Sequence, residues 1–226
     1  MTSEWNGADA AHRYGATLLE GDLVRFRALE DADLPDLVRW WRDPEWAVLQ
    51  QIIVRPRPAD SVVEMFRSWS KSDGSGEVGF SVVDRMSGTL VGHVTLFGAK
   101  LPVRAATLAV MIGSEHVGQG FGTDAVRLLT DYGFREMGLN RIEIQVHAFN
   151  DRARAVYAKT GYRVEGVRRE ATFHDGRFHD EVIMSALARD WSSRSTGATP
   201  EPPDAAVRGS SRGGNESVAG GRARGR

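Results

Sequence analysis

The chain of 226 residues contains no cysteine. A disulfide framework, a thiolate nucleophile and a cysteine-ligated metal centre are therefore excluded. The longest apolar runs have the length of a strand, as in Thr107–Ile112, and fall far short of the ~20 residues of a membrane-spanning helix. The N-terminal residues show no basic start followed by an apolar stretch, as a secretory signal would. We expect a cytoplasmic protein that has no membrane partner.

The chain also lacks a strong net charge, which is −1 overall. Residues 192–226 hold six arginines and three acidic residues, so residues 1–191 carry a net charge of −4. This mildly acidic part has no basic stripe of the kind that binds a phosphate backbone, so nucleic acid is not expected as a partner. A cationic small molecule is compatible with the charge.

The last 35 residues, 192–226, contain no Leu, Ile, Met, Phe, Trp or Tyr and are rich in Gly, Ser, Pro and Arg. Such a segment has little apolar surface to bury, and we predict a disordered tail. An RNA-binding arm, as part of a nucleic-acid adaptor, is the alternative for its arginine-rich end. Residues 1–17 are predicted to be a poorly ordered N-terminal segment.

Residues 18–191 are predicted to form one domain. Alternating apolar residues predict strands and helical spacing predicts helices. The expected strands are 23–29, a hairpin over 76–97, 104–112, 141–146, 162–169 and 177–186, and the expected helices are 31–42, 58–72, 123–137 and 151–160. Strand pairs followed by strands alternating with helices predict a mixed α/β sheet.

Three glycines, Gly118, Gly120 and Gly122, stand between the strand that ends at Ile112 and the next helix. Glycines let backbone N–H groups approach an anion, and the start of a helix favours a pyrophosphate. The Walker lysine is missing here, and Thr123 departs from the dinucleotide-binding fingerprint. The alternative is a tight turn that simply requires glycine.

A second motif runs from Asn150, a natural N-cap, through Tyr157 to Gly161, a natural helix terminator. Together the two motifs resemble motifs A and B of the GCN5-related N-acetyltransferases (GNAT). The segments 166–170, 175–180 and 182–187 are similar to the branch that holds the ribosomal-protein N-terminal and polyamine acetyltransferases. The resemblance extends over residues 18–191.

The resemblance implies a sheet of about seven strands, splayed centrally, with helices on both faces and acetyl-CoA in the gap as co-substrate. It implies backbone bonds from Val110 and Ile112 to pantetheine, whose arm Asn150 would also bind. The turn that would cradle the phosphates consists of Val117, Gly118, Gln119, Gly120, Phe121, Gly122 and Thr123. Val117 replaces the usual Arg or Gln, but the amide donors do not depend on that side chain.

Tyr157 is, by the resemblance, the general acid that protonates the leaving thiolate, a role suited to a phenol. Without the resemblance, a core aromatic on a helix face is the simpler interpretation. Several relatives carry Ser where this chain has Ala153, which leaves Tyr157 as the sole side-chain acid and weakens the link to ribosomal-protein acetylation.

The general base is left open between two residues of the strand 141–147, Glu143 first and His147 second. Side chains alternate along a strand, so both share a face with Gln145. Some relatives have a glutamate at the position of Gln145. The alternatives are a structural pairing of Glu143 with Arg141 and proton loss through a water chain.

The amine acceptor is expected near the first two helices and the loop 172–179. Aromatic faces and carboxylates there could hold a cation, although the tryptophans could equally be core residues. The candidates are Trp40, Trp41, Trp46, Trp69, Asp43, Glu45 and Asp175. The six histidines form no helical i, i+4 pair, so no metal is expected.

These observations predict an N-acetyltransferase that moves an acetyl group from acetyl-CoA to a primary amine of a small molecule or a protein N-terminus, by direct attack in a ternary complex. A catalytically inactive acyl-CoA sensor is the alternative. Members of the family often dimerise, so a homodimer is left open.

Overall fold

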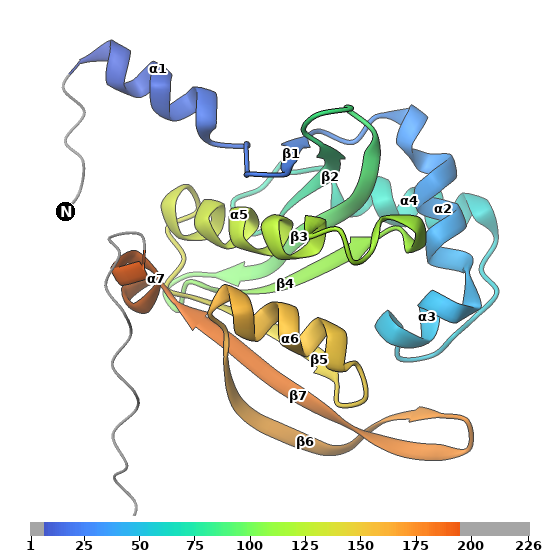
Figure 1. The fold of residues 1–226 in the computed structure, drawn as a ribbon. Coiled ribbons are helices and arrows are strands. Elements are labelled where there is room, and N and C mark those ends of the chain that lie inside the picture. The colour runs from blue at the N-terminus through green and yellow to red at the C-terminus, as the bar shows by residue number, and fades with distance from the viewer. Residues whose placement is uncertain (1–6, 195–226) are drawn as a thin grey trace, which may run out of the picture.

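A computed structural model describes residues 7–194 of the chain (Figure 1). Residues 1–6 and 195–226 lie outside this part, and with them nearly all of the segment predicted to be a disordered tail. The division into a domain over 18–191 and two terminal segments stays a prediction.

The described elements follow the predicted order. The strands are β1 (Val24–Arg27), β2 (Val78–Asp84), β3 (Leu90–Lys100), β4 (Ala105–Ile112), β5 (Arg141–His147), β6 (Arg163–His174) and β7 (Arg177–Leu187). The α-helices are α1 (Ala8–Thr17), α2 (Leu34–Arg42), α3 (Pro44–Gln50), α4 (Ala59–Trp69), α5 (Phe121–Arg135), α6 (Asp151–Thr160) and α7 (Ala188–Arg194). Short 3-10 turns, η1 (Asp31–Asp33) and η2 (Ser114–His116), complete the order.

The strands within residues 7–194 form one seven-stranded sheet of order β1-β2-β3-β4-β5-β7-β6. All neighbouring pairs are antiparallel except β4 and β5, which run parallel. That pairing extends only from Ala105↔Arg141 to Thr107↔Glu143, and beyond it the two strands diverge. The predicted fold class, a mixed sheet splayed in its middle, is confirmed.

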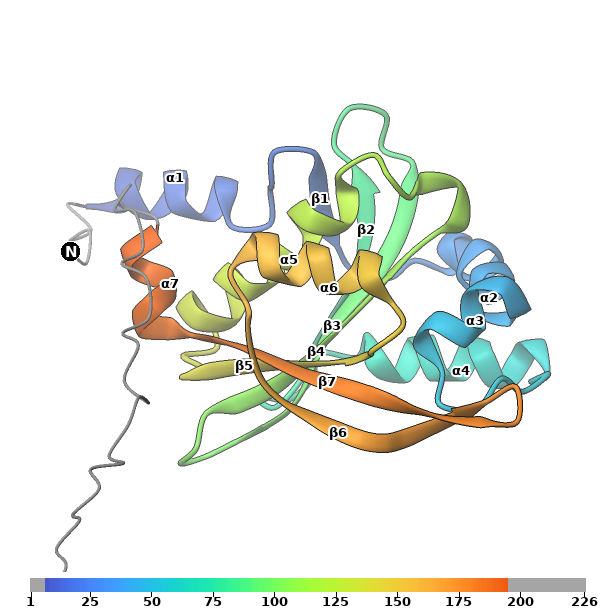
Figure 2. The same cartoon turned by 60° about the horizontal axis from the view of Figure 1, so that its bottom comes forward.

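Helices cover both faces of the sheet, as predicted. On one face α5 and α6 lie side by side (Figure 2). Ala125 and Leu129 of α5 belong to the same buried core as Val94 and Ile142 of the sheet. On the other face α2 and α4 form a second core with β2, β3 and β4, in which Phe66 is fully buried. Two separate apolar cores therefore clamp the sheet and fix the strands that diverge between them.

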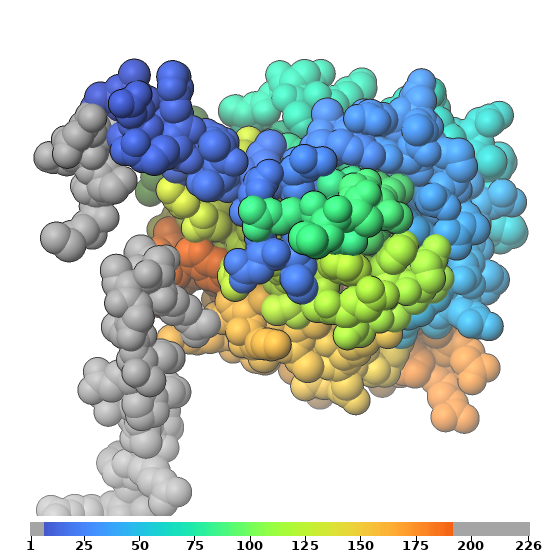
Figure 3. Space-filling model, turned by 45° about the horizontal axis from the view of Figure 1, so that its top comes forward, coloured from blue at the N-terminus to red at the C-terminus, as the bar shows by residue number. Residues whose placement is uncertain are grey.

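Three helices were absent from the predicted pattern: α1, α3 and α7. Helix α1 covers most of the segment expected to be poorly ordered, and it stands away from the main body (Figure 3). Its end is tied to α5, because the Tyr14 hydroxyl donates to Glu136 and the Arg135 guanidinium lies 4.6 Å from the Tyr14 ring centroid. Helix α7 packs Trp191 edge-on against Phe134.

Candidate active site

A cavity of about 560 Å³ lies where β4 and β5 diverge. Its walls come from these two strands, the glycine turn, α6, α3 with the residues after it, and one residue each of β3 and β7. Because side chains alternate along a strand, the walls fall into two halves. The first faces α5 and α6, and the second faces α3.

The first half contains most of the residues predicted to bind CoA. Those that line the cavity are Val110, Ile112, Val117, Gly118, Gly120, Gly122, Thr123 and Asn150. After Thr107 the edge of β4 has no pairing with β5. Unpaired backbone groups at such an edge are ready to bond an extended ligand such as a pantetheine arm.

The glycine turn has the shape of an anion cradle. Gly118 (φ 80°) and Gly120 (φ 92°) are both in the left-handed region that favours glycine. Gly120 is the N-cap of α5, whose 15 residues give a full helix dipole. A Cβ at Gly118 would meet no atom of the described chain within 4 Å, so the space beside this turn is open. These features fit a pyrophosphate.

Two residues of the predicted cradle direct their side chains elsewhere. Phe121 is buried in the core beneath α5, and the Gln119 amide donates to the Glu115 carbonyl oxygen at 3.1 Å. Any contribution of these two residues to phosphate binding would therefore come from their backbone N–H groups.

Asn150 lines the cavity, but its side chain already has two partners. Its Oδ1 accepts from the Ala153 N–H at 3.1 Å and so caps α6, as the sequence predicts. Its Nδ2 donates to the Leu49 carbonyl oxygen at 3.2 Å, which ties the end of α3 to the start of α6. The side chain therefore positions two walls of the site.

Tyr157 extends from α6 to the cavity and is 8% exposed. Burial raises its pKa to about 12, so the phenol keeps its proton throughout the neutral range. The neighbouring Tyr162 is also buried, but its hydroxyl is 2.7 Å from the Thr130 hydroxyl. Within residues 7–194, no group hydrogen-bonds the Tyr157 hydroxyl, which leaves it available for a ligand.

His147 at the end of β5 lines the second half of the cavity and is 6% exposed. Its ring stacks on Phe149, with centroids 5.0 Å apart. Burial first, and then the charge of nearby His174, lower the pKa of His147 below its ordinary value of 6.5. The imidazole is therefore neutral at pH 7 and able to accept a proton.

Glu143, the other candidate base, is placed differently. It stands opposite Thr107, where β4 and β5 are still paired, and it does not line the cavity. The Arg141 guanidinium contacts it at 2.7 Å and Glu165 at 2.6 Å. This is the structural pairing that the sequence left open, whereas Gln145 does reach the cavity.

The tryptophans expected at the acceptor site divide into two groups. Trp46 of α3 lines the cavity. Trp40, Trp41 and Trp69 belong to the second core, where the Trp40 indole N–H donates to Glu115 at 2.9 Å. Outside the cavity wall lie Asp43, which caps α3, and Glu45, Asp175 and the loop 172–179.

Sequence reasoning missed Glu181 of β7 and the apolar residues Leu49, Ile52 and Phe97, which all line the cavity. The signal for Glu181 is its register, since it is the cross-strand partner of His147. The predicted strands alone do not say which residue of 177–186 lies opposite His147, so this pairing could be read only from the structure.

In residues 7–194, no three His, Asp or Glu side chains are grouped so that they could hold a metal ion. The helices of the same range are all too short or too polar to cross a membrane.

The sequence model for the family described as "Acetyltransferase (GNAT) domain" matches residues 24–163. The chain is 36% identical over 104 residues to the "Putative ribosomal N-acetyltransferase YdaF" of Bacillus subtilis, an alignment that covers 46% of this chain and 57% of that protein. It is 31% identical over 114 residues to the "Spermidine N(1)-acetyltransferase" of Vibrio cholerae, covering 50% of this chain and 66% of that protein.

Among solved structures, the fold matches spermidine N-acetyltransferase from Vibrio cholerae in complex with CoA and spermine. The TM-score is 0.67 at 26% identity, over 75% of this chain and 98% of that one. The matched region contains both sequence motifs and the splayed sheet between them. The chain therefore belongs to the GNAT family of acetyl-CoA-dependent N-acetyltransferases.

Proposed function

We propose that this protein transfers the acetyl group of acetyl-CoA to a primary amine of a small molecule, with both substrates bound at once. The observation that carries the proposal is the cavity through the splayed sheet. It has the glycine turn in one half and His147 in the other. Two ligands that enter from opposite faces would meet at the gap between β4 and β5.

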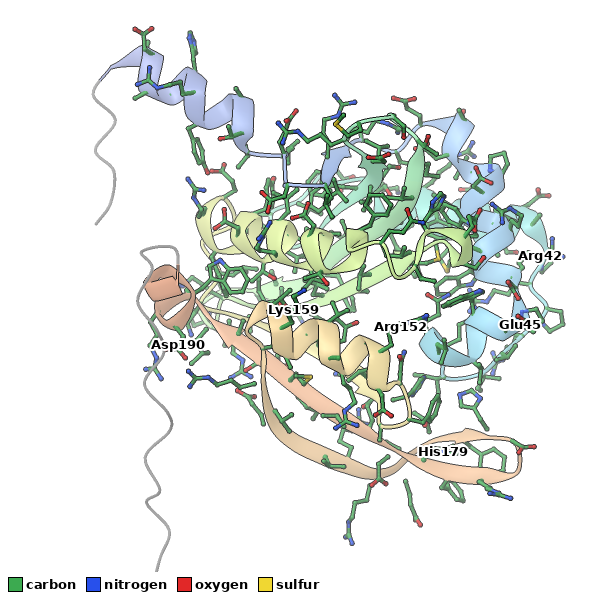
Figure 4. The ribbon with its side chains drawn as sticks, in the orientation of Figure 1. Arg42, Glu45, Arg152, Lys159, His179 and Asp190 are labelled. Carbon is green, nitrogen blue, oxygen red and sulfur yellow. The ribbon has the colours of Figure 1, made fainter. Side chains whose placement is uncertain are left out.

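Acetyl-CoA would be held in the first half. The backbone N–H groups at Gly118 and Gly120 and the start of α5 receive the phosphates, and the edge of β4 receives the pantetheine arm. The bound co-substrate supplies an acetyl thioester, and its thiolate is the leaving group. Lys159 also lines the cavity from the end of α6 and adds a positive charge (Figure 4).

Two side chains would move protons. His147, neutral because burial lowers its pKa, accepts the proton that the amine must lose before it can attack a carbonyl carbon. Tyr157, kept protonated by burial, donates its proton to the departing thiolate. Glu143 lies in an ion pair outside the cavity, so the geometry favours His147 as the base, directly or through water.

The test is release of free thiol from acetyl-CoA over a panel of primary amines, with Tyr157→Phe beside the native protein. We expect turnover on at least one amine class. In the variant, kcat should fall about 100-fold while CoA affinity is retained, because the loss of a general acid affects the chemical step.

Tyr162→Phe is the matched control, because it removes a buried phenol hydroxyl that lies away from the cavity wall. It should reduce stability and leave kcat nearly unchanged. CoA binding without turnover on any amine would support the inactive sensor instead, and a failure to bind CoA would contradict both functions.

A further inference from the structure

The half of the cavity that faces α3 contains a buried carboxylate that belongs to neither motif. Phe97 pairs with Thr107 and Thr107 with Glu143, so by alternation Gln145 and His147 lie on this same face. Glu181, the cross-strand partner of His147, is on it too. Direct cross-strand partners have Cβ atoms ~5 Å apart, which places this carboxylate beside the imidazole.

Glu181 is 7% exposed and lines the cavity. Its Oε2 accepts from Arg168 at 2.7 Å, and Arg168 itself is largely exposed. In the described part of the chain no group donates to Oε1. Arg168 pairs with one oxygen of this carboxylate, and the other keeps its acceptor capacity beside the cavity, so it is suited to a cationic ligand.

Gln50, Thr107 and Gln145 are uncharged polar residues of this half, and most of the remainder is apolar. Its other side chains include Trp46, Leu49, Ile52, Phe97 and Met111. Glu181 is the sole acidic residue in the described wall of the cavity, whereas Arg152 and Lys159 are basic. A ligand with several positive charges would place all but one of them beside uncharged or like-charged side chains, which is unfavourable.

We propose that Glu181 binds the ammonium group of the acceptor, and that the acceptor is a small primary amine with one positive charge and an apolar body. This inference rests on the proposed function and names its substrate class. It separates the chain from its spermidine-acetylating relatives, since spermidine carries three amino groups. In the reaction, the ammonium held at Glu181 gives one proton to His147, and the freed lone pair of nitrogen attacks the thioester carbonyl carbon. As the C–N bond forms and the C–S bond breaks, the thiolate takes the proton of Tyr157, and the second proton of the nitrogen passes to the Tyr157 phenolate, directly or through water.

The first experiment compares 2-phenylethylamine with spermidine and with a peptide that begins with alanine, by thiol release at saturating acetyl-CoA. We expect kcat/KM for 2-phenylethylamine to exceed that for spermidine at least about tenfold, the value of one well-placed charged contact. Preference for spermidine or for the peptide would overturn the substrate class.

The second experiment uses Glu181→Gln, which keeps the size of the side chain and removes its charge. For 2-phenylethylamine we expect kcat/KM to fall about 10- to 100-fold, mainly through a higher KM, at unchanged CoA affinity. Arg168→Gln is the control, because it breaks the same ion pair and leaves the carboxylate in place. Its KM should be equal to or lower than that of the native protein.

The outcomes separate a binding role from a structural one. If both variants lose activity and thermal stability equally, Glu181 only anchors β6 to β7 and the proposal fails. If Glu181→Gln leaves KM unchanged while amines are still acetylated, the proposal fails and the proposed function stands. If CoA binds but the native protein turns over none of the amines, the CoA complex is titrated with 2-phenylethylamine in a calorimeter. Absence of 2-phenylethylamine binding in that titration overturns the proposal.

Discussion

The guanidinium of Arg152 lies 4.7 Å from the ring centroid of Trp46. The two residues belong to α6 and α3, and both line the cavity. Figure 4 shows Arg152 on α6. A cation over an aromatic face is stabilising, and the bond from Asn150 to the Leu49 carbonyl oxygen joins the same two helices. Helix α3 is thus held against the start of α6, where it forms one wall of the proposed acceptor half.

We expect Arg152→Ala to loosen this wall. A cation–π contact of about 1 kcal/mol corresponds to roughly a fivefold rise in acceptor KM, with a smaller change in kcat. Arg152→Lys should recover part of the loss, since lysine also places a cation over an aromatic ring. Steady-state kinetics in both substrates provides the check. A rise in KM for acetyl-CoA alone would assign Arg152 to the co-substrate instead.

Gly118→Ala should weaken CoA binding more than it weakens the fold. The added methyl meets no protein atom within 4 Å, so its structural cost is the strain of a left-handed alanine, about 1 kcal/mol. The methyl would occupy the open space where phosphates are expected, and we predict a loss of affinity of at least about tenfold.

Gly88→Ala is the matched control for this prediction. Gly88 has a similar φ of 73° and equally open surroundings, but it lies in the turn between β2 and β3, away from the cavity. Calorimetric titration with CoA and thermal unfolding compare the two variants. Equal affinity in both would refute a phosphate cradle at Gly118.

The elements that the sequence predicted best are those whose ends are marked by capping or terminating residues in the sequence itself. Helix α6 begins and ends where predicted, because Asn150 caps it and Gly161 (φ 109°) terminates it. Helix α3 was missed because the predicted helix over 31–42 ends just before Asp43-Pro44, and a proline commonly ends a helix. Asp43 also caps the next helix, and Pro44 is its first residue, a position that proline favours.

The site shows the same difference between features that the local sequence marks and features that it does not. The CoA half could be predicted because its turn is local and its donors are backbone groups. The α3 half could not, because it depends on strand register and on which tryptophan faces the core. Trp40 and Trp46 were both candidates for the acceptor site, yet Trp40 is 2% exposed in the core and Trp46 lines the cavity.

If His147 is the base, kcat should depend on pH in a defined direction. Only the neutral imidazole accepts a proton, so kcat should fall about tenfold per pH unit below the pKa of His147. Because burial and His174 lower that pKa, the acidic limb of the pH profile, in which kcat falls, should lie below pH 6.5. At pH 7 kcat should no longer change with pH.

Variants of two histidines check this limb. His147→Gln should reduce kcat about 100-fold and abolish the acidic limb, whereas His179→Gln, in the same aromatic cluster but off the cavity wall, should retain it. An unchanged limb in His147→Gln would instead favour a water chain or another base.

Asp33 links β1, β2 and α2, and its replacement should destabilise the fold. It is 3% exposed, and its carboxylate accepts two bonds of 2.6 Å from Arg27 and one of 2.7 Å from Ser81. Burial alone would raise its pKa, but these hydrogen bonds outweigh burial and hold the pKa below its ordinary value of 3.8. Asp33→Asn leaves Arg27 without its buried partner, so we expect a loss of about 3 kcal/mol in the free energy of unfolding at pH 7.

The lowered pKa also fixes how this contribution depends on pH. A carboxyl group that is more acidic in the folded chain than in the unfolded one stabilises the fold above pH 3.8, and the contribution disappears as the pH falls through the folded pKa. Urea unfolding should therefore show that the difference in the free energy of unfolding between the native protein and Asp33→Asn becomes smaller as the pH falls from 7 to 3. Asp36→Asn is the control, since its exposed pair with Arg39 contributes less than about 0.5 kcal/mol. For Asp33→Asn, a difference in the free energy of unfolding as small as that of the control would contradict a buried ion pair that holds β1 to the second core. A difference that grows as the pH falls would contradict it as well.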